Sequence, residues 1–94
     1  MEHMIKIFTI EDNLMYGTLI KHTLEKKQNY DVTLFQNGED CLKHMHLNPD
    51  IVTIDYNLPG ITGLEILKRI NNYNNDIDVI IVSGQTDIEV AVEA

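Results

Sequence analysis

The sequence predicts an α/β fold, a doubly wound parallel β-sheet with helices on both faces. Short apolar runs rich in β-branched residues alternate with amphipathic stretches of helical spacing. This alternation is typical of βαβ units. The run at residues 51–56 is mostly apolar, which favours a strand that is covered on both faces.

The first half of the chain predicts two strands and two helices. The strands are expected at residues 5–10 and 32–35, and the helices at residues 14–28 and 39–47. In the first helix Tyr16, Ile20 and Leu24 recur at four-residue spacing and define an apolar face. Asn48-Pro49 ends the second helix, in which Leu42 and Met45 can face inward, because proline cannot continue a helix.

The second half repeats the pattern from residue 51. Strands are expected at residues 51–56 and 79–82, with helices starting at Thr62 and at residue 88. Thr62 and Glu65 match a Thr-x-x-Glu capping box, and the side chains predicted to face the sheet are Leu64, Leu67 and Ile70. Thr86 or Asp87 is expected to cap the last helix, in which the chain ends.

Length, charge and cysteine content narrow the class of protein. Ninety-four residues fit a single domain, residues 1–94. The net charge of −8 repels phosphate backbones, so direct nucleic-acid binding by this segment is not expected. A single cysteine, Cys41, suits a reducing cytoplasm, and the apolar run at residues 79–82 is far too short to span a membrane. We therefore expect a cytoplasmic protein without a membrane partner.

Acidic and hydroxyl side chains follow three of the predicted strands. Glu11 and Asp12 come after the first strand, Asp55 ends the third, and Ser83 ends the fourth. Because the carboxyl ends of parallel strands meet at one edge of a sheet, these side chains are expected to lie together. Clustered carboxylates repel one another unless a cation neutralises them, and hard oxygen ligands suit Mg²⁺. A magnesium-dependent acidic pocket follows.

Asp55 is the central candidate for chemistry in that pocket. A carboxylate beside Mg²⁺ can attack phosphorus, because the metal offsets the charge that develops on the phosphoryl oxygens. The Ser83 hydroxyl could donate a hydrogen bond to the transferred group.

Three segments resemble the receiver domains of two-component response regulators. They are Ile-Glu-Asp-Asn at 10–13, Asp-Tyr-Asn-Leu-Pro-Gly-Ile-Thr-Gly at 55–63 and Val-Ser-Gly at 82–84. The resemblance implies a flavodoxin-like sheet of strand order 2-1-3-4. It implies that Asp55 is the phosphoacceptor, that Mg²⁺ is held by Glu11, Asp12, Asp55 and the backbone carbonyl of Asn57, and that Ser83 contacts the phosphoryl group. The stretch at residues 83–94 is similar to receivers of the nitrogen-regulation class.

The resemblance also implies a function and its partners. The phosphoryl donor would be a sensor histidine kinase or a phosphotransfer protein. The domain would catalyse its own phosphorylation and dephosphorylation without being an enzyme, and would switch an output domain, for example in transcription regulation. The sequence does not identify the kinase, the output domain or the regulated process.

The chain departs from the family pattern by ending early. Receivers have five strands and five helices, and here the chain stops within the expected fourth helix, so the fifth strand and helix, with the family's lysine, have no counterpart. We expect the strand at residues 79–82 to be left as a free edge, through which two copies could form a homo-oligomer.

Two other functions are alternatives to a phosphoacceptor receiver domain. A phosphatase of the haloacid-dehalogenase type also uses an aspartate nucleophile with magnesium, but it needs a second aspartate where this chain has Asn57. A receiver that serves only as an interaction surface would not need Glu11, Asp12, Asp55 and Ser83 together. Turnover of a general phosphate ester would favour the phosphatase, and lack of magnesium binding would favour the inert module.

Overall fold

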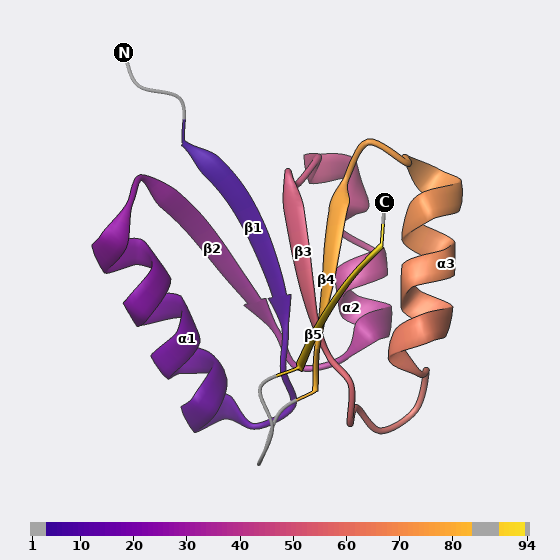
Figure 1. The fold of residues 1–94 in the computed structure, drawn as a ribbon, viewed down its shortest axis with the longest axis horizontal. Coiled ribbons are helices and arrows are strands. Elements are labelled where there is room, and N and C mark those ends of the chain that lie inside the picture. The colour runs from indigo at the N-terminus through magenta and orange to yellow at the C-terminus, as the bar shows by residue number, and fades with distance from the viewer. Residues whose placement is uncertain (1–3, 84–88, 94) are drawn as a thin grey trace.

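A computed structural model describes residues 4–83 and 89–93, with side chains for residues 4–82. Five strands form one sheet in the order β2-β1-β3-β4-β5 (Figure 1). The strands are β1 (Ile5–Ile10), β2 (Tyr30–Phe35), β3 (Ile51–Asp55), β4 (Asp78–Ser83) and β5 (Glu89–Glu93). The helices are α1 (Leu14–Lys27), α2 (Gly38–Leu42), the short 3₁₀ helix η1 (Met45–Leu47) and α3 (Gly63–Tyr73).

The first four strands are parallel and confirm the predicted order 2-1-3-4. Strand β1 pairs with β2 on one side and β3 on the other, and β3 pairs with β4. Each crossover between parallel strands contains a helix, as the alternating sequence pattern requires. The carboxyl ends of these four strands therefore lie at one edge of the sheet.

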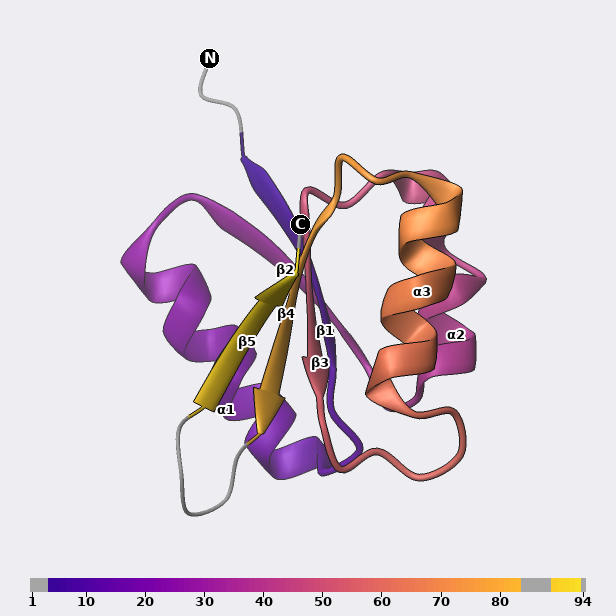
Figure 2. The same cartoon turned by 45° about the vertical axis from the view of Figure 1, so that its right-hand side comes forward.

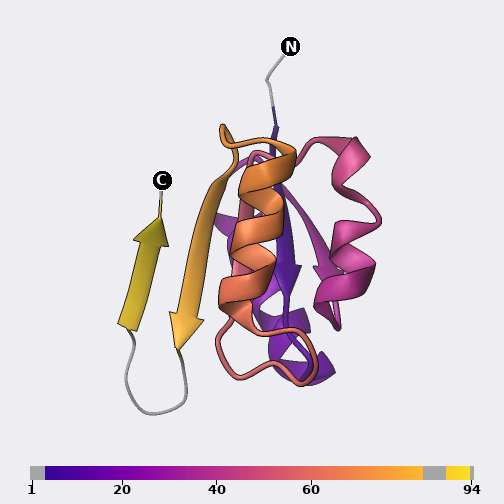
Figure 3. The same ribbon diagram turned by 90° about the vertical axis from the view of Figure 1, so that its right-hand side faces the viewer.

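The last strand corrects the prediction for the end of the chain. A helix is expected over residues 88–94, but Glu89–Glu93 form β5, which pairs antiparallel with β4 (Figure 3). The alternation Glu-Val-Ala-Val-Glu suits a strand, and β-branched valines favour extended backbone. Because β4 otherwise has a partner on one side only, pairing satisfies its outer backbone groups. The free β4 edge expected to join two copies is therefore not present. The expected caps, Thr86 and Asp87, lie outside the described residues.

The helices divide between the two faces of the sheet. Helix α1 covers one face, and α2 and α3 cover the other (Figures 1 and 2). The main core lies on the α2/α3 side, because the buried cluster joins side chains of these helices to alternate residues of the strands. Its fully buried members include Phe8, Ile10, Val52, Ile54, Ile66, Ile70, Val79 and Cys41.

The inward face of α3 differs from the predicted one by part of a turn. Ile66, Leu67 and Ile70 are buried, whereas Leu64 is 58% exposed. The prediction is correct for Leu67 and Ile70 and wrong for Leu64. Leu64 stands two residues before Ile66, about 200° around the helix, so both cannot face the sheet.

The start of α3 follows the sequence closely. Thr62 caps the helix, since its side-chain oxygen accepts a hydrogen bond from the Glu65 N–H at 3.1 Å. The Glu65 carboxylate bonds Arg69 at 3.1 Å. Gly60, in the turn after β3, has φ +82°, a conformation that favours glycine.

The second helix is shorter than predicted. The expected helix at 39–47 is interrupted after Leu42, and the chain continues through the 3₁₀ helix η1 to Asn48, whose φ is 57°. The tighter turn is seen in the bond from the His44 N–H to the Cys41 carbonyl, three residues back. Met45 still faces inward, at 2% exposed, and Leu42 packs against the core.

Cys41 is a fully buried member of this core. Its side chain is 0% exposed, and burial raises the pKa of the thiol to about 12. Within the described residues, none of the helices has the length and apolar character needed to cross a bilayer.

Candidate functional site

The predicted polar residues lie at the carboxyl ends of three neighbouring strands. Glu11 directly follows β1, Asp55 is the last residue of β3, and Ser83 is the last residue of β4. Because β1 and β4 both pair with β3, Asp55 stands at the middle strand of the three. This is the edge of an open parallel sheet at which ligands commonly bind.

Three carboxylates come together at this edge. Glu11, Asp12 and Asp55 each offer one oxygen, and these oxygens lie within 4.8 Å of one another. The three side chains differ in exposure, since Glu11 is buried, Asp55 is half-buried and Asp12 is exposed. The cluster therefore extends from the buried carboxyl edge of the sheet to the solvent.

The charged form of the Glu11 side chain is unfavourable at its position in the fold. Its side chain is 6% exposed, and its pKa is raised from 4.5 to about 7. Burial is the largest cause, and the neighbouring carboxylates of Asp55 and Asp12 raise the pKa further. The Asn13 N–H, which donates to Glu11 Oε2 at 3.1 Å, acts in the opposite direction. A cation beside the cluster would relieve this repulsion.

Backbone hydrogen bonds fix where the carboxylates stand. The Glu11 N–H donates to the Phe35 carbonyl at 2.9 Å, which ties the end of β1 to β2. The Asn57 N–H donates to Asp55 Oδ1 at 3.1 Å, and the Tyr56 N–H donates to the Val82 carbonyl at 2.9 Å. Both acids are therefore held at a strand end whose main chain is anchored to its neighbour.

Asn13 is a residue whose role the sequence analysis did not assign. Its N–H binds Glu11, while its Oδ1 accepts from the Tyr16 N–H at 2.9 Å and caps α1. A single residue thus joins the acidic cluster to the start of α1. An asparagine just before a helical stretch is a usual capping signal, so the cap could have been found from the sequence.

A cavity of about 360 Å³ opens beside the cluster, on the α1 face of the sheet. It is lined by Glu11 and Asp55 together with Tyr16, Ile20 and the threonines Thr9 and Thr53. The Thr53 hydroxyl donates to Thr9 Oγ1 at 3.1 Å. This threonine pair could not be found from the sequence, since its two members belong to strands that are brought together only by folding.

The donor set fits a hard divalent cation. Carboxylate oxygens are the ligands that Mg²⁺ prefers, and an exposed member such as Asp12 leaves room for the water molecules that Mg²⁺ retains. Burial, and after it the neighbouring carboxylates of Asp55 and Asp12, raise the pKa of Glu11, so a charged Glu11 is costly without a cation beside it. The residues present therefore fit the expected metal.

Comparison with known families decides what kind of domain carries this cluster. The sequence matches the response regulator receiver domain over residues 7–94. The chain belongs to this family. The receiver domain serves in signalling, and an acidic pocket that holds Mg²⁺ and a phosphoacceptor residue are general to the family.

Relatives of this receiver domain are longer proteins with different names, and the match covers only a part of each. The chain is 36% identical over 88 residues to a protein-glutamate methylesterase/protein-glutamine glutaminase of Halalkalibacterium halodurans, matching 92% of the chain and 25% of that protein. It is 30% identical over 91 residues to the transcriptional regulatory protein MalR of Bacillus subtilis, matching 93% of the chain and 38% of that protein. The chain thus spans about a quarter to two fifths of these curated relatives.

A solved structure shares both the fold and the sequence of this receiver domain. The response regulator TrrA from Thermotoga maritima, in complex with Mg(2+)-BeF, superposes with a TM-score of 0.80 at 30% identity. The match covers 88% of this chain and 72% of that one. The family and the flavodoxin-like sheet that the sequence predicted are therefore confirmed.

Two of the predicted site residues are placed only in part. Asn57 lies two residues beyond Asp55, exposed, with its N–H on the Asp55 carboxylate. Ser83 ends β4 as expected, at a backbone position paired with Glu89 of β5, and its side chain lies outside the described residues. The carbonyl role of Asn57 and the hydroxyl role of Ser83 stay predictions, as does the nitrogen-regulation class.

Proposed function

We propose that this receiver domain accepts a phosphoryl group on Asp55 in a magnesium-dependent reaction. The observation that carries the proposal is the meeting of Glu11, Asp12 and Asp55, with one oxygen of each within 4.8 Å of the others at the carboxyl edge of the sheet. A surface cluster of acids would not bury one member to 6% exposed. Residues arranged in this way have a purpose beyond solubility.

Each residue has a chemical role in the proposal. A carboxylate oxygen of Asp55 attacks the phosphorus of a phosphohistidine or an acyl phosphate, so that an O–P bond forms and the bond to the donor breaks. Glu11, Asp12, Asp55 and the Asn57 carbonyl would hold Mg²⁺, which would offset charge on the phosphoryl oxygens. The Ser83 hydroxyl would donate to one of these oxygens.

The partners in the proposal follow from the reaction. The donor is a sensor histidine kinase or a phosphotransfer protein, and phosphorylation shifts the domain between two conformations that an output domain distinguishes. We propose that the domain acts in the cytoplasm and does not itself bind nucleic acid, given its net charge of −8. A dimer through the β4 edge is not part of the proposal, because β5 occupies that edge.

The haloacid-dehalogenase type of phosphatase gains no support. The second aspartate that it needs is replaced by Asn57, whose side chain cannot act as a general acid or base. The proposed reaction therefore places the phosphoryl group on the domain itself, which would also catalyse its own dephosphorylation.

Intact-mass analysis after incubation with a small acyl phosphate tests the proposal. With Mg²⁺ the chain should gain about 80 Da, one phosphoryl group, and with EDTA it should gain nothing. Asp55→Asn should abolish the gain, whereas Asp76→Asn, an exposed acid on another loop, should leave it unchanged. Isothermal titration should show Mg²⁺ binding that Asp12→Asn weakens.

Two outcomes would count against the proposal. Magnesium binding without a mass gain would leave a metal-binding interaction module. A mass gain that survives Asp55→Asn would place the acceptor elsewhere. Release of phosphate from a general ester in excess over the protein would instead favour the phosphatase.

A further inference from the structure

The outer edge of β2 is one end of the sheet. In a parallel pair, alternate residues turn their backbone groups toward the neighbouring strand. The Ile5 N–H donates to the Asn29 carbonyl at 3.0 Å, and the Glu11 N–H donates to the Phe35 carbonyl at 2.9 Å. The odd-numbered residues of this segment therefore face β1, and Val32 faces outward. An outward N–H and C=O on an edge strand form a template for pairing with another strand.

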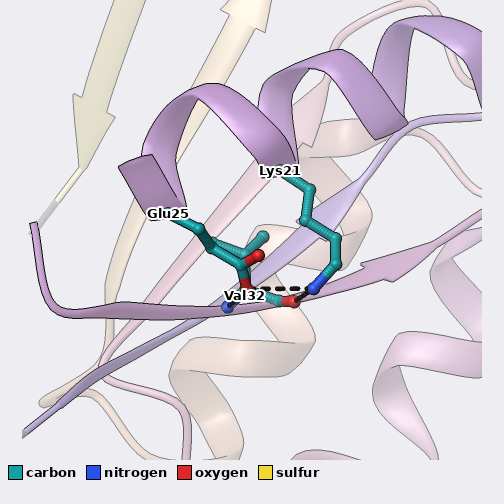
Figure 4. A network of polar contacts seen from close by, with 3 residues as sticks. All are labelled: Lys21, Glu25 and Val32. Carbon is teal, nitrogen blue, oxygen red and sulfur yellow. Dashed lines mark hydrogen bonds and ion pairs between the residues drawn. The ribbon is translucent and has the colours of Figure 1, made fainter. Parts of the chain in front are cut away.

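Two side chains of α1 bind both backbone groups of Val32. Glu25 Oε2 accepts from the Val32 N–H at 3.1 Å, and Lys21 Nζ donates to the Val32 carbonyl at 2.6 Å (Figure 4). Lys21 and Glu25 also bind each other at 2.9 Å, one helical turn apart. A carboxylate and an ammonium thus occupy the acceptor and donor places that a neighbouring strand would fill.

A second ion pair of the same spacing shows that this arrangement is not general to the helices. Glu65 and Arg69 on α3 lie 3.1 Å apart, also at positions i and i+4. Among the described residues, these two side chains hydrogen-bond each other and no strand. The Lys21–Glu25 pair is distinguished by its contact with the edge of the sheet, and not by its charges.

We propose that Lys21 and Glu25 form a clasp that closes the outer edge of β2 to strand addition, and that the strand it excludes is β2 of a second copy. The inference goes beyond the proposed phosphotransfer and does not depend on it. None of the three residues belongs to the carboxylate cluster.

The sequence of β2 suits pairing with itself. A two-fold axis at Val32 would set two copies antiparallel, and each Val32 N–H would meet the other Val32 carbonyl. In that register Asp31 lies opposite Thr33 of the other copy, so that like charges do not face each other directly. Asp31 and Thr33 are both exposed and offer no bulk that would prevent approach. In this register the clasp occupies the two backbone groups of Val32 through which the copies would pair.

Self-association of a double variant is the first test. Sedimentation equilibrium should show the wild type as a monomer, whereas Lys21→Ala/Glu25→Ala should self-associate at least about 10-fold more tightly. The matched control, Glu65→Ala/Arg69→Ala, removes an ion pair of the same spacing and should behave as the wild type. A double variant that is folded and remains as monomeric as the control overturns the proposal.

Exchanging the two charges separates the clasp from helix stability. Lys21→Glu/Glu25→Lys retains an ion pair on α1, but it places a carboxylate near the Val32 carbonyl and an ammonium near the Val32 N–H. If the clasp acts through the strand edge, this variant should associate as the alanine variant does, and its Val32 amide should exchange with deuterium faster than in the wild type. Monomeric behaviour of the exchanged variant contradicts the proposal even if the alanine variant fails to fold.

The geometry of association is the second test. Cys41 is fully buried, so a nitroxide label can be directed to an introduced cysteine at the exposed position Thr33. Pulsed electron paramagnetic resonance on the exchanged variant should give inter-label distances of about 20 Å or less, as expected for paired edge strands. Association without such distances would mean that another surface is responsible, and would overturn the assignment to β2.

Discussion

Helices α1 and α3 lie on opposite faces of the same sheet and bury very different surfaces. Helix α3 buries Gly63, Ile66, Leu67 and Ile70, whereas Gly17 is the single buried residue of α1. Leu14, Met15, Tyr16 and Leu19 of α1 are each at least 46% exposed. The face under α3 holds the main core, and the face under α1 holds the cavity beside Asp55. Stability and access to the site are thus divided between the two faces.

Truncation of one side chain on each helix gives the largest contrast. Ile66→Ala removes a fully buried side chain and should lower the free energy of unfolding by about 2–5 kcal/mol. Leu19→Ala removes one that is 58% exposed and should change it by about 0.5 kcal/mol or less. Urea unfolding followed by circular dichroism measures both. Equal losses would show that α1 contributes as much to the core as α3 does.

Acid titration should reveal the strain at the cavity side of the site. The folded-state pKa of Glu11 is about 7 against an ordinary 4.5, so its contribution to stability is full below pH 4.5 and is lost as the pH rises toward 7. In EDTA, the free energy of unfolding should therefore fall by roughly 2 kcal/mol across this window. Glu11→Gln should remove that part of the slope. If the wild type showed no such fall in the free energy of unfolding, the pKa of Glu11 would not be raised in the folded state.

Adding one methyl group on each face gives the smallest contrast. A Cβ at Gly38 would collide with Ile66, which is fully buried and cannot move aside, so Gly38→Ala should cost about 1–3 kcal/mol. A Cβ at Gly17 would meet the end of the Leu34 side chain at 2.6 Å, but Leu34 is half-buried and can yield. Gly17→Ala also gains about 1 kcal/mol of helix propensity, so it should be close to neutral. Thermal unfolding compares the two; a Gly17→Ala variant as unstable as Gly38→Ala would contradict the contrast.

The sequence allowed most of the fold and the acidic cluster to be predicted, because both follow from local patterns. The alternation of strands and helices indicated a parallel sheet, the resemblance to receiver domains implied the strand order, and the acids directly after the strands marked the edge where Glu11, Asp12 and Asp55 meet. The Thr62 cap was visible as a Thr-x-x-Glu motif. Such features depend on neighbours in the sequence.

The errors concern features that depend on distant parts of the chain. Spacing alone allowed Leu64 to face the sheet, and the position of α3 against the sheet selected Ile66 instead. The alternation at residues 89–93 suits a strand, but only the pairing with the open side of β4 gives that strand its place in the sheet. The bond between Glu25 and the Val32 N–H joins residues whose proximity follows only from the packing of α1 on β2.

The burial of Cys41 gives this chain an internal reporter of its own opening. A thiol that is 0% exposed and has its pKa raised to about 12 cannot react with an alkylating reagent while the core is closed. Since it is the single cysteine of the sequence, the alkylation rate of the unmodified protein measures how often the α2/α3 face opens. The proposed Mg²⁺ binding and phosphorylation would act at the carboxyl edge of the sheet, and their effect on this rate would measure how far binding at the site changes the opening of the core.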